Sequence, residues 1–389
     1  MAVFTESPRI TFLQRERPMR ADLFLVIPYL VLSAIGLLMI YSATAPYLEA
    51  AGADPAGDLK RQAIYVVTGF VVFGAMSAID IKALRPLVPA LYLATIVLLV
   101  VVLFLGREVQ GAQRWIPIWF IQFQPAEFAK LAVILGIASV LAATPKPPLA
   151  WHRIAQVLAI VALPSALIFL QPDLGTMLVF AFLAVLMLFV GGATGRQLAF
   201  LLIAVVVGSV LLFQVGAIKE YQITRLTAFL EPTADLQGAQ YNQAQSEIAI
   251  GSGGLTGRGL GEGTQTNLRF VPEQESDFIF TALGEQMGFV GSALVILLFS
   301  LIVWRMLAAS FNSRDRFGQL VAVGGAALVA FHVFVNVGMT IRLMPVTGLP
   351  LPFMSAGGTV FVAMSAALGM AHSIWLRRSP VPGDRQFES

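Results

Sequence analysis

Two charged residues at the start of an apolar run could bind an anion. Glu127 and Lys130 are three positions apart, so a helix places both side chains on one face. Lys130 is followed by the apolar run 131–141, and a lysine at membrane depth costs about 2.5–3.5 kcal/mol on insertion scales. One interpretation is a structural ion pair near the membrane interface. The other is a cation, oriented by Glu127, that faces a polar cavity.

Asp277 is a candidate for acid–base chemistry because it stands where a polar segment becomes an apolar helix. A carboxylate at the membrane surface can remove a proton from a hydroxyl group as a general base. A structural interpretation is also open. In that case Ser276 would cap the helix and Asp277 would complement the helix dipole.

Two more charged residues precede apolar helices. Arg114 is followed by Trp115 in a short loop. The two are either an interfacial aromatic residue beside a solvated arginine, or a second cation near the same cavity. Asp173 follows Pro172 and is expected to be a structural carboxylate at a helix start, where the helix dipole favours it.

The segment 251–263 contains seven glycines in thirteen residues. Such a composition does not favour a helix, and it permits positive φ angles and close backbone approach. No Gly-Lys-Ser/Thr sequence follows, so the segment is not a nucleotide-binding P-loop. The structural interpretation is a flexible surface loop.

The elements that must position these residues are membrane helices. Only 12% of the 389 residues are charged and 57% are hydrophobic, whereas a soluble domain carries about 25% charged residues. A bilayer core needs about 20 apolar residues per helix. The candidate spans are 22–44, 62–79, 87–106, 124–143, 153–170, 173–191, 196–215, 277–306, 318–342 and 355–376. The predicted fold is an all-α integral membrane protein, a polytopic bundle of about ten transmembrane helices.

The distribution of basic residues sets the expected orientation. Arginine and lysine gather in the short segments on the side of both termini, and such segments remain cytoplasmic. We therefore expect cytoplasmic tails at 1–21 and 377–389 and a transmembrane domain at 22–376. A large extracytoplasmic loop at 216–276 would separate spans seven and eight.

Counting spans from that orientation places Glu127, Asp173 and Asp277 at the extracytoplasmic ends of three helices. The first span is expected to stay in the mature protein. Its apolar run from Leu23 to Ala43 is longer than the apolar region of a signal peptide, which has about 7–15 residues.

Composition excludes several classes of site. The chain has no cysteine, which excludes disulfides, thiolate metal sites and cysteine nucleophiles. Its three histidines (His152, His332 and His372) are scattered along the sequence, so a histidine-built metal site is not expected. The net charge of +3 provides no electrostatic basis for binding nucleic acid.

The motifs resemble those of the SEDS proteins (shape, elongation, division and sporulation), the family of RodA, FtsW and SpoVE. The similarity runs from the first span to the last. It rests on RWI (114–116), FQPAEFAK (123–130), QPDLGT (171–176), QSEIAIGSGG (245–254), PEQESDFIF (272–280), NVGMTIR (336–342), PVTGLPLPF (345–353) and SAGGT (355–359). The segments 272–274 and 345–348 are more similar to the cell-elongation members than to the cell-division members.

A few positions depart from the family pattern. The family usually shows His-Thr before its key aspartate, where this chain has Glu275 and Ser276. Ala356 and Val360 replace a tyrosine and a serine of the final motif, and Ala126 stands where serine is common. None of these changes removes a residue that the expected chemistry requires.

The resemblance implies a peptidoglycan glycosyltransferase of the bacterial cytoplasmic (inner) membrane that polymerises lipid II during cell elongation. Asp277 would be the catalytic base, and Lys130, Glu127 and Arg114 would bind the pyrophosphate of the substrate. The implied partners are lipid II, a class B penicillin-binding protein (a monofunctional transpeptidase), other elongation-complex membrane proteins and membrane lipid. The sequence shows no dedicated metal site, although Mg²⁺ or Mn²⁺ could assist the leaving group.

A lipid II flippase, or another membrane transporter without polymerase activity, is the alternative function. Intramembrane ion pairs are often transport residues. A transporter also predicts charges near mid-depth and an inverted repeat. No clear repeat is visible, and the carboxylates stand at helix ends, which favours chemistry at the extracytoplasmic face.

Overall fold

The structure is a computed structural model, and it describes residues 21–109, 112–118, 121–144, 148–214 and 239–378. The predicted tails therefore lie outside the described residues, except for Ala21 and residues 377–378. The first part of the predicted loop 216–276 also lies outside them.

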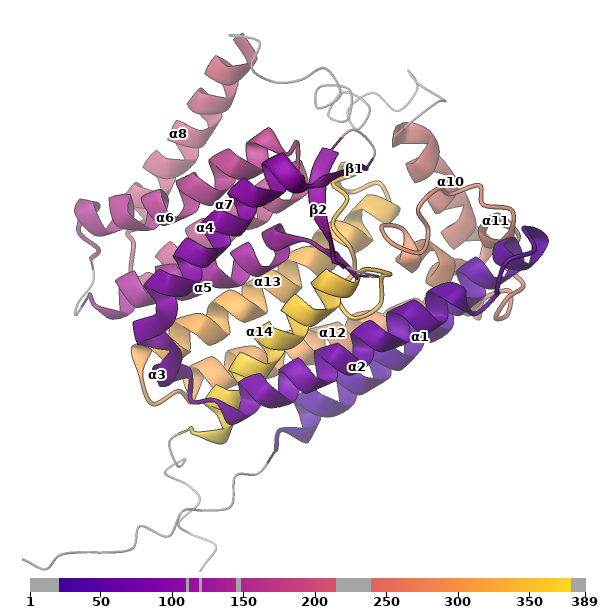
Figure 1. Cartoon of the computed structure of the whole chain (residues 1–389), viewed down its shortest axis with the longest axis horizontal. Helices are drawn as coiled ribbons and strands as arrows, with labels where there is room; N and C mark the ends of the chain where they lie inside the picture. The colour runs from indigo at the N-terminus through magenta and orange to yellow at the C-terminus, as the bar shows by residue number, and fades with distance from the viewer. Residues whose placement is uncertain (1–20, 110–111, 119–120, 145–147, 215–238, 379–389) are drawn as a thin grey trace, which may run out of the picture.

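Nine helices within the described part of the chain have the length and apolar composition of a membrane span. They are α1 (Leu23–Ala50), α2 (Gly57–Ala78), the run Ile81–Leu105, α5 (Pro125–Ala142), α6 (Trp151–Leu170), α7 (Leu174–Gly191), α12 (Ile279–Phe311), α13 (Arg316–Thr340) and α14 (Gly358–Leu376). The third is built from α3 (Ile81–Leu84), a short 3-10 turn (Arg85–Leu87) and α4 (Val88–Leu105). The helices pack side by side in one bundle (Figure 1). The predicted all-α membrane fold is confirmed.

Helix α8 (Gly195–Gln214) occupies the place of the predicted seventh span, 196–215. Among the described residues, its stretch Gly195–Gly208 counts as an apolar helix shorter than a full span. Most of its described side chains are exposed. It contacts α7 and leans away from the rest of the bundle (Figure 1).

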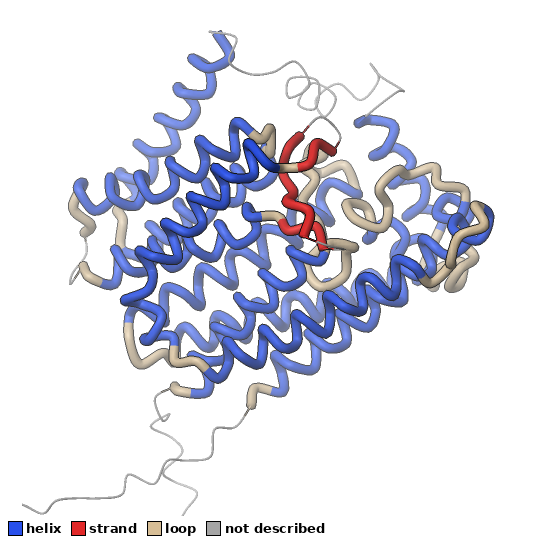
Figure 2. The backbone as a smooth tube through the Cα atoms, viewed as in Figure 1, coloured by secondary structure: helices blue, strands red, loops and turns tan. Residues whose placement is uncertain are grey.

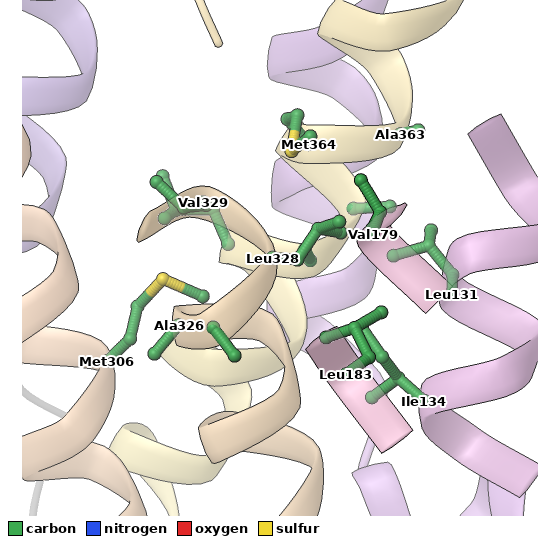
Figure 3. Packing of buried hydrophobic residues seen from close by; sticks show 14 of the residues in the cluster. Leu131, Ile134, Val179, Leu183, Met306, Ala326, Leu328, Val329, Ala363 and Met364 are labelled. Carbon is green, nitrogen blue, oxygen red and sulfur yellow. The ribbon is translucent and has the colours of Figure 1, made fainter. Parts of the chain in front are cut away.

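Helices α5, α13 and α14 form the centre of the bundle, because they have the largest buried shares of all the spans. Ile134, Leu328 and Met364 are buried there against α7 and α12 (Figure 3). Small residues let the helices approach closely. A Cβ atom on Gly324, for example, would lie 2.6 Å from Cγ2 of Ile134. The residues that project from α5 and α13 therefore stand on tightly packed elements.

Three short strands, which the sequence did not predict, connect α4 to α5. β1 (Arg107–Val109), β2 (Ala112–Ile118) and β3 (Ile121–Phe123) form an antiparallel sheet in the order β1-β2-β3 (Figure 2). The predicted spans leave 106–124 as a connection too short to cross the membrane. The strands fold that connection back onto the start of α5.

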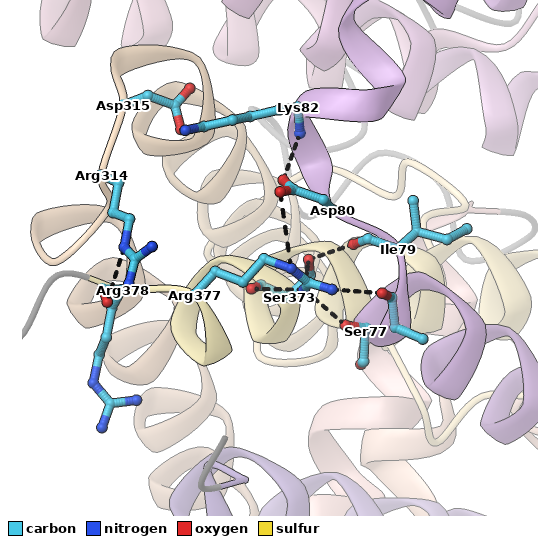
Figure 4. Close-up of polar contacts among 10 residues, drawn as sticks. Ser77, Ile79, Asp80, Lys82, Arg314, Asp315, Ser373, Arg377 and Arg378 are labelled. Carbon is cyan, nitrogen blue, oxygen red and sulfur yellow. Dashed lines mark hydrogen bonds and ion pairs between the residues drawn. The ribbon is translucent and has the colours of Figure 1, made fainter. Parts of the chain in front are cut away.

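Both ends of the described chain lie at one end of the bundle (Figure 1). Polar contacts join the helix ends there (Figure 4). Arg377 donates to the carbonyl oxygens of Ser77 and Ala78 at the end of α2, at 3.1 and 2.5 Å. Such bonds satisfy carbonyl groups that have no partner within their own helix. Nearby, Arg305 and Asp22 form a buried ion pair with an N–O distance of 2.9 Å.

The connection between α13 and α14, residues 341–357, is irregular, and its second half, 349–355, is largely buried. The ring of Phe353 packs against that of Tyr29, with centroids 4.9 Å apart. Non-helical backbone at membrane depth needs hydrogen-bond partners from the surrounding protein, and Asn336 donates to the carbonyl oxygen of Leu349 at 2.8 Å. The connection therefore dips into the end of the bundle opposite the chain termini.

Candidate active site

The candidate site lies at that opposite end, where α5, α7 and α12 begin. Glu127 stands in the first turn of α5, while Asp173 and Asp277 come just before α7 and α12. The prediction that all three carboxylates share one end of the bundle is confirmed. They surround the α13–α14 connection, which also packs on the first turn of α7.

Asp277 ends a tight turn just before α12. The N–H groups of Ser276 and Asp277 donate to the carbonyl oxygen of Glu273 at 3.2 and 3.0 Å. Glu273 has φ 53°, a left-handed conformation that is uncommon outside glycine. The Asp277 side chain is partly exposed, and its Oδ2 lies 3.5 Å from where a Cβ atom on Gly348 would stand. The carboxylate therefore faces the α13–α14 connection and is partly accessible from outside.

Ser276 does not cap α12, so the structural interpretation of this residue is wrong. The residue before the helix is Phe278, whose side chain makes no capping hydrogen bond. The Ser276 hydroxyl instead donates to the carbonyl oxygen of Glu273 at 3.2 Å. The turn at Glu273 delays the helix start to Ile279, which leaves Ser276 too early in the chain to act as a cap.

Glu127 and Lys130, which we call the α5 pair, form an ion pair at the start of α5. Nζ of Lys130 lies 2.6 Å from Oε1 of Glu127, and the two side chains are 0% and 3% exposed, respectively. Nζ also lies 3.2 Å from Nε2 of His332 on α13. Oε2 of Glu127 has no hydrogen-bond partner among the described residues. The α5 pair is therefore inside the bundle, and its ammonium group does not reach a surface.

One face of α13 connects the α5 pair to Asp277. His332 and Asn336 are four positions apart, so they are neighbours on the helix surface. Besides contacting the lysine, His332 places Nδ1 3.2 Å from the carbonyl oxygen of Pro350. Asn336 donates to the carbonyl oxygens of Leu349 and Asp277, both at 2.8 Å. Neither residue was predicted as part of the site. The available signal was a polar residue inside an apolar span.

Arg114, on β2, binds the turn between α6 and α7. Its Nε donates to the carbonyl oxygen of Gln171 at 3.0 Å, and its Nη2 donates to that of Pro172. Asp173 caps α7, since its carboxylate accepts from the N–H of Thr176 at 3.1 Å, which confirms the structural interpretation of this residue. Across the described ranges, no hydrogen bond or ion pair joins Arg114 to the α5 pair.

The glycine-rich segment 251–263 packs against α12, although a flexible surface loop was the structural interpretation. α12 has non-helical backbone at Gly288 (φ 65°, ψ −162°), so carbonyl groups before it lose their helical partners. The N–H groups of residues 258–259 replace those partners by donating to the carbonyl oxygens of residues 285–286, at 3.0 and 3.1 Å. A side chain at Gly257 would collide with that backbone. Gly257 and Gly253 therefore serve close backbone approach to α12.

Glu285 is a buried carboxylate on α12 that the sequence did not reveal. It is 0% exposed, and it accepts from the N–H groups of Gln265 and Thr266 at 2.8 and 2.9 Å. The hydroxyl of Thr266 donates to it as well. An ionised carboxylate only accepts hydrogen bonds, so these partners suit it. Gln274 then joins Thr266 to the turn before Asp277, by donating to the Thr266 carbonyl oxygen at 2.8 Å.

Glu275, which replaces a common family residue, forms an ion pair with Arg269 at 3.1 Å. The guanidinium of Arg269 also lies over the ring of Tyr47, 3.8 Å from its centroid. The carbonyl oxygen of Glu275 accepts from the N–H of Ala356 at 2.7 Å. The charge that this departure adds is therefore paired with a cation, and its backbone supports the α13–α14 connection.

The described residues contain no group of three or more histidine, aspartate or glutamate side chains that could hold a metal ion. Mg²⁺ is usually bound by one or two carboxylates together with phosphate groups of a substrate, so this observation concerns only a site built entirely from protein side chains.

The fold and the site define a polytopic helical membrane protein with a candidate active site at one end of its bundle. A family model described as "Cell cycle protein", covering FtsW, RodA and SpoVE, matches residues 22–379. The chain is 36% identical over 344 residues to peptidoglycan glycosyltransferase MrdB of Escherichia coli (strain K12), covering 88% of this chain and 91% of MrdB. It is also 36% identical over 352 residues to stage V sporulation protein E of Bacillus subtilis (strain 168), covering 90% and 95% of the two chains.

Solved structures agree with these matches. The rod shape determining protein RodA of Thermus thermophilus aligns with a TM-score of 0.67 and 28% identity, over 93% of this chain and 98% of that one. A chain from a study of structural coordination of polymerization and crosslinking by a peptidoglycan synthase complex aligns with a TM-score of 0.76 and 28% identity, over 93% and 99%. The chain belongs to the FtsW/RodA/SpoVE family, as its motifs indicated.

Proposed function

We propose that the protein is a peptidoglycan glycosyltransferase that polymerises lipid II into glycan strands during cell elongation. The class of activity follows from relatives such as MrdB, a peptidoglycan glycosyltransferase 36% identical to this chain. The observation that carries the proposal is the partly exposed Asp277 carboxylate at the end of the bundle, facing the α13–α14 connection. Such a position suits a substrate whose sugars lie outside the membrane and whose lipid lies within it.

In the proposed reaction, Asp277 removes the proton from the 4-hydroxyl of the acceptor GlcNAc. The hydroxyl oxygen attacks C1 of the donor MurNAc and forms a β-glycosidic bond. The α-linked bond from C1 to the phosphate oxygen breaks, and undecaprenyl pyrophosphate leaves with the bonding electrons. A single displacement inverts C1, so no covalent enzyme intermediate is needed. A positioned general base typically contributes about 10²–10⁴-fold to the rate.

The departing pyrophosphate needs positive charge, which we assign to Lys130, oriented by Glu127, and to Arg114. In the described conformation Lys130 is 0% exposed. It therefore acts on the pyrophosphate through space, and a direct contact requires a rearrangement that exposes Nζ. Arg114 uses two of its five N–H donors to bind the α6–α7 turn, so the other three are left for further partners.

We further propose a class B penicillin-binding protein as the partner, and the bacterial cytoplasmic membrane as the location, with both termini in the cytoplasm. The partner is supported by the similarity to a chain of a peptidoglycan synthase complex whose study concerns polymerization and crosslinking. The orientation is supported by basic residues such as Arg314, Arg377 and Arg378 at the end of the bundle that carries both chain ends (Figure 4).

The alternative function is a lipid II flippase that makes no polymer. The completely buried α5 pair favours it, since intramembrane ion pairs often serve transport. Purified protein in detergent micelles separates the two functions, because micelles have no sidedness. Supplied with lipid II, a glycosyltransferase forms a glycan polymer that a muramidase degrades, whereas a flippase alone forms none. Folded protein that forms no polymer, with or without the transpeptidase partner, would contradict the proposal.

A further inference from the structure

Asn336 contacts the backbone of the proposed base, Asp277. It lies on α13 and is 0% exposed. Its Nδ2 donates to the carbonyl oxygens of Asp277 and Leu349, both at 2.8 Å. A single amide group thus joins the turn that carries Asp277 to the α13–α14 connection that Asp277 faces.

We propose that Asn336 is a positioning residue, which holds Asp277 against the α13–α14 connection so that its carboxylate meets the acceptor hydroxyl. This inference rests on the proposed function, because it concerns the same base. Asn336 is completely buried, and its Nδ2 donates to two backbone carbonyl oxygens. Its contribution is made through the backbone of Asp277.

The backbone around Asp277 needs such an external contact. Glu273, before Asp277, has φ 53°, and Phe353, in the connection, has φ 64°. Left-handed conformations of this kind are strained for residues other than glycine and persist only where the surrounding structure holds them. The N–H of Ala356 donates to the Glu275 carbonyl oxygen at 2.7 Å and so ties the turn to the connection. The bond from Asn336 adds a contact at Asp277 itself, from a buried helix.

His332 gives the connection a second attachment on the same face of α13. Its Nδ1 lies 3.2 Å from the carbonyl oxygen of Pro350, the residue directly after Leu349. Two successive carbonyl groups are therefore tied to one helix face, and α13 is one of the most deeply buried spans of the bundle. The connection cannot slide along α13 without losing both contacts. Asn336 thus fixes the position of Asp277 relative to a deeply buried helix.

The substitution Asn336→Asp tests this role with little change in shape. A carboxylate oxygen cannot donate a hydrogen bond, and it would stand against two carbonyl oxygens. A displacement of reacting groups by about 1 Å can cost about 100-fold in rate. We expect kcat for lipid II polymerisation to fall about 10- to 100-fold, while KM changes less than about twofold, because no contact with the substrate is removed.

A matched control makes the same chemical change elsewhere on the chain. Nδ2 of Asn312 donates to the carbonyl oxygen of Ala308 at 2.7 Å, at the other end of α12. Asn312→Asp loses that bond far from the site, and its kcat should stay within about twofold of the wild type. Asn336→Ser keeps one donor and should give a kcat between those of Asn336→Asp and the wild type. All rates are normalised to folded protein, measured by thermal denaturation in detergent.

Equal kcat values for Asn336→Asp and Asn312→Asp would overturn the positioning role. So would a raised KM with unchanged kcat, since that result indicates a contact with substrate. If Asn336→Asp does not fold, Asn336→Ser decides the question by the same two criteria. Asp277→Asn in the same series keeps the two proposals separate. An active Asp277→Asn protein contradicts the proposed base, whereas an inactive one beside a fully active Asn336→Asp protein contradicts only the positioning role.

Discussion

Asp277 and the α5 pair differ in their exposure to solvent, although both contact the same face of α13. Asp277 is partly exposed at a junction between loop and helix, whereas Lys130 and Glu127 are 0% and 3% exposed inside the bundle. On α13, Asn336 contacts the backbone of Asp277, and His332 contacts Lys130 of the α5 pair. A partly exposed carboxylate can meet a substrate as the protein stands. In a buried ion pair each charge depends on its partner, so the loss of one partner leaves the other charge uncompensated inside the bundle.

Outside Asp277, the largest effect of a substitution is expected at the α5 pair. Removing one partner of a buried ion pair leaves an uncompensated charge and costs about 3–5 kcal/mol. Lys130→Met should therefore lower the thermal denaturation midpoint in detergent sharply. The double variant Glu127→Gln/Lys130→Met should recover most of the loss, because no charge remains unpaired. A Lys130→Met protein as stable as the wild type would contradict this account of the α5 pair, whether or not it is active.

A smaller effect is expected at Glu285, which holds the segment leading to Asp277. In Glu285→Gln, an amide NH₂ group would face N–H donors, and an unsatisfied buried group costs about 1–3 kcal/mol. We expect faster proteolysis of the segment 253–276 and a loss of polymerisation of about tenfold, through displacement of the turn before Asp277. Glu262→Gln is the matched control, because Glu262 is exposed in the same segment. Equal proteolysis and activity in both variants would show that Glu285 does not support the site.

The smallest effect is expected at Arg114. Lysine cannot reproduce the forked geometry with which Arg114 donates to two carbonyl groups. Arg114→Lys should lose one hydrogen bond, worth about 0.5–1.5 kcal/mol, and only a few-fold in polymerisation rate. Arg153→Lys is the control, since Arg153 contacts only the adjacent side chain of Gln156 among the described hydrogen bonds. A large increase in KM for lipid II would instead make Arg114 a direct ligand of the pyrophosphate.

The spans could be predicted from sequence because apolar length is a local property. Predicted spans 153–170 and 173–191 correspond to α6 (Trp151–Leu170) and α7 (Leu174–Gly191). Pairing within one helix turn is equally local, so the spacing of Glu127 and Lys130 predicted their contact, which the structure confirms at 2.6 Å. The roles assigned to these residues in the reaction stay predictions.

Contacts between distant segments could not be predicted in this way. Asn336 meets the Asp277 carbonyl group only because α13 packs beside the start of α12. Glu285 could not be recognised from sequence as a supporting residue, because its partners lie in a segment that folds back over the break at Gly288. Ser276 was placed at a helix start that the Glu273 turn moves further along the chain. In each case tertiary packing decided what local spacing left open.

The most direct test of the account is the rate of lipid II polymerisation by Asp277→Asn protein in detergent. The change preserves side-chain size and removes the capacity to accept a proton. Asp54→Asn is the matched control, because Asp54 is an exposed partner of Lys60, at 2.6 Å, in the loop between α1 and α2. We predict a rate about 10²–10⁴-fold below that of the wild type for folded Asp277→Asn protein, and a near wild-type rate for Asp54→Asn. Folded Asp277→Asn protein that retains a rate within about tenfold of the wild type would contradict the assignment of Asp277 as the base.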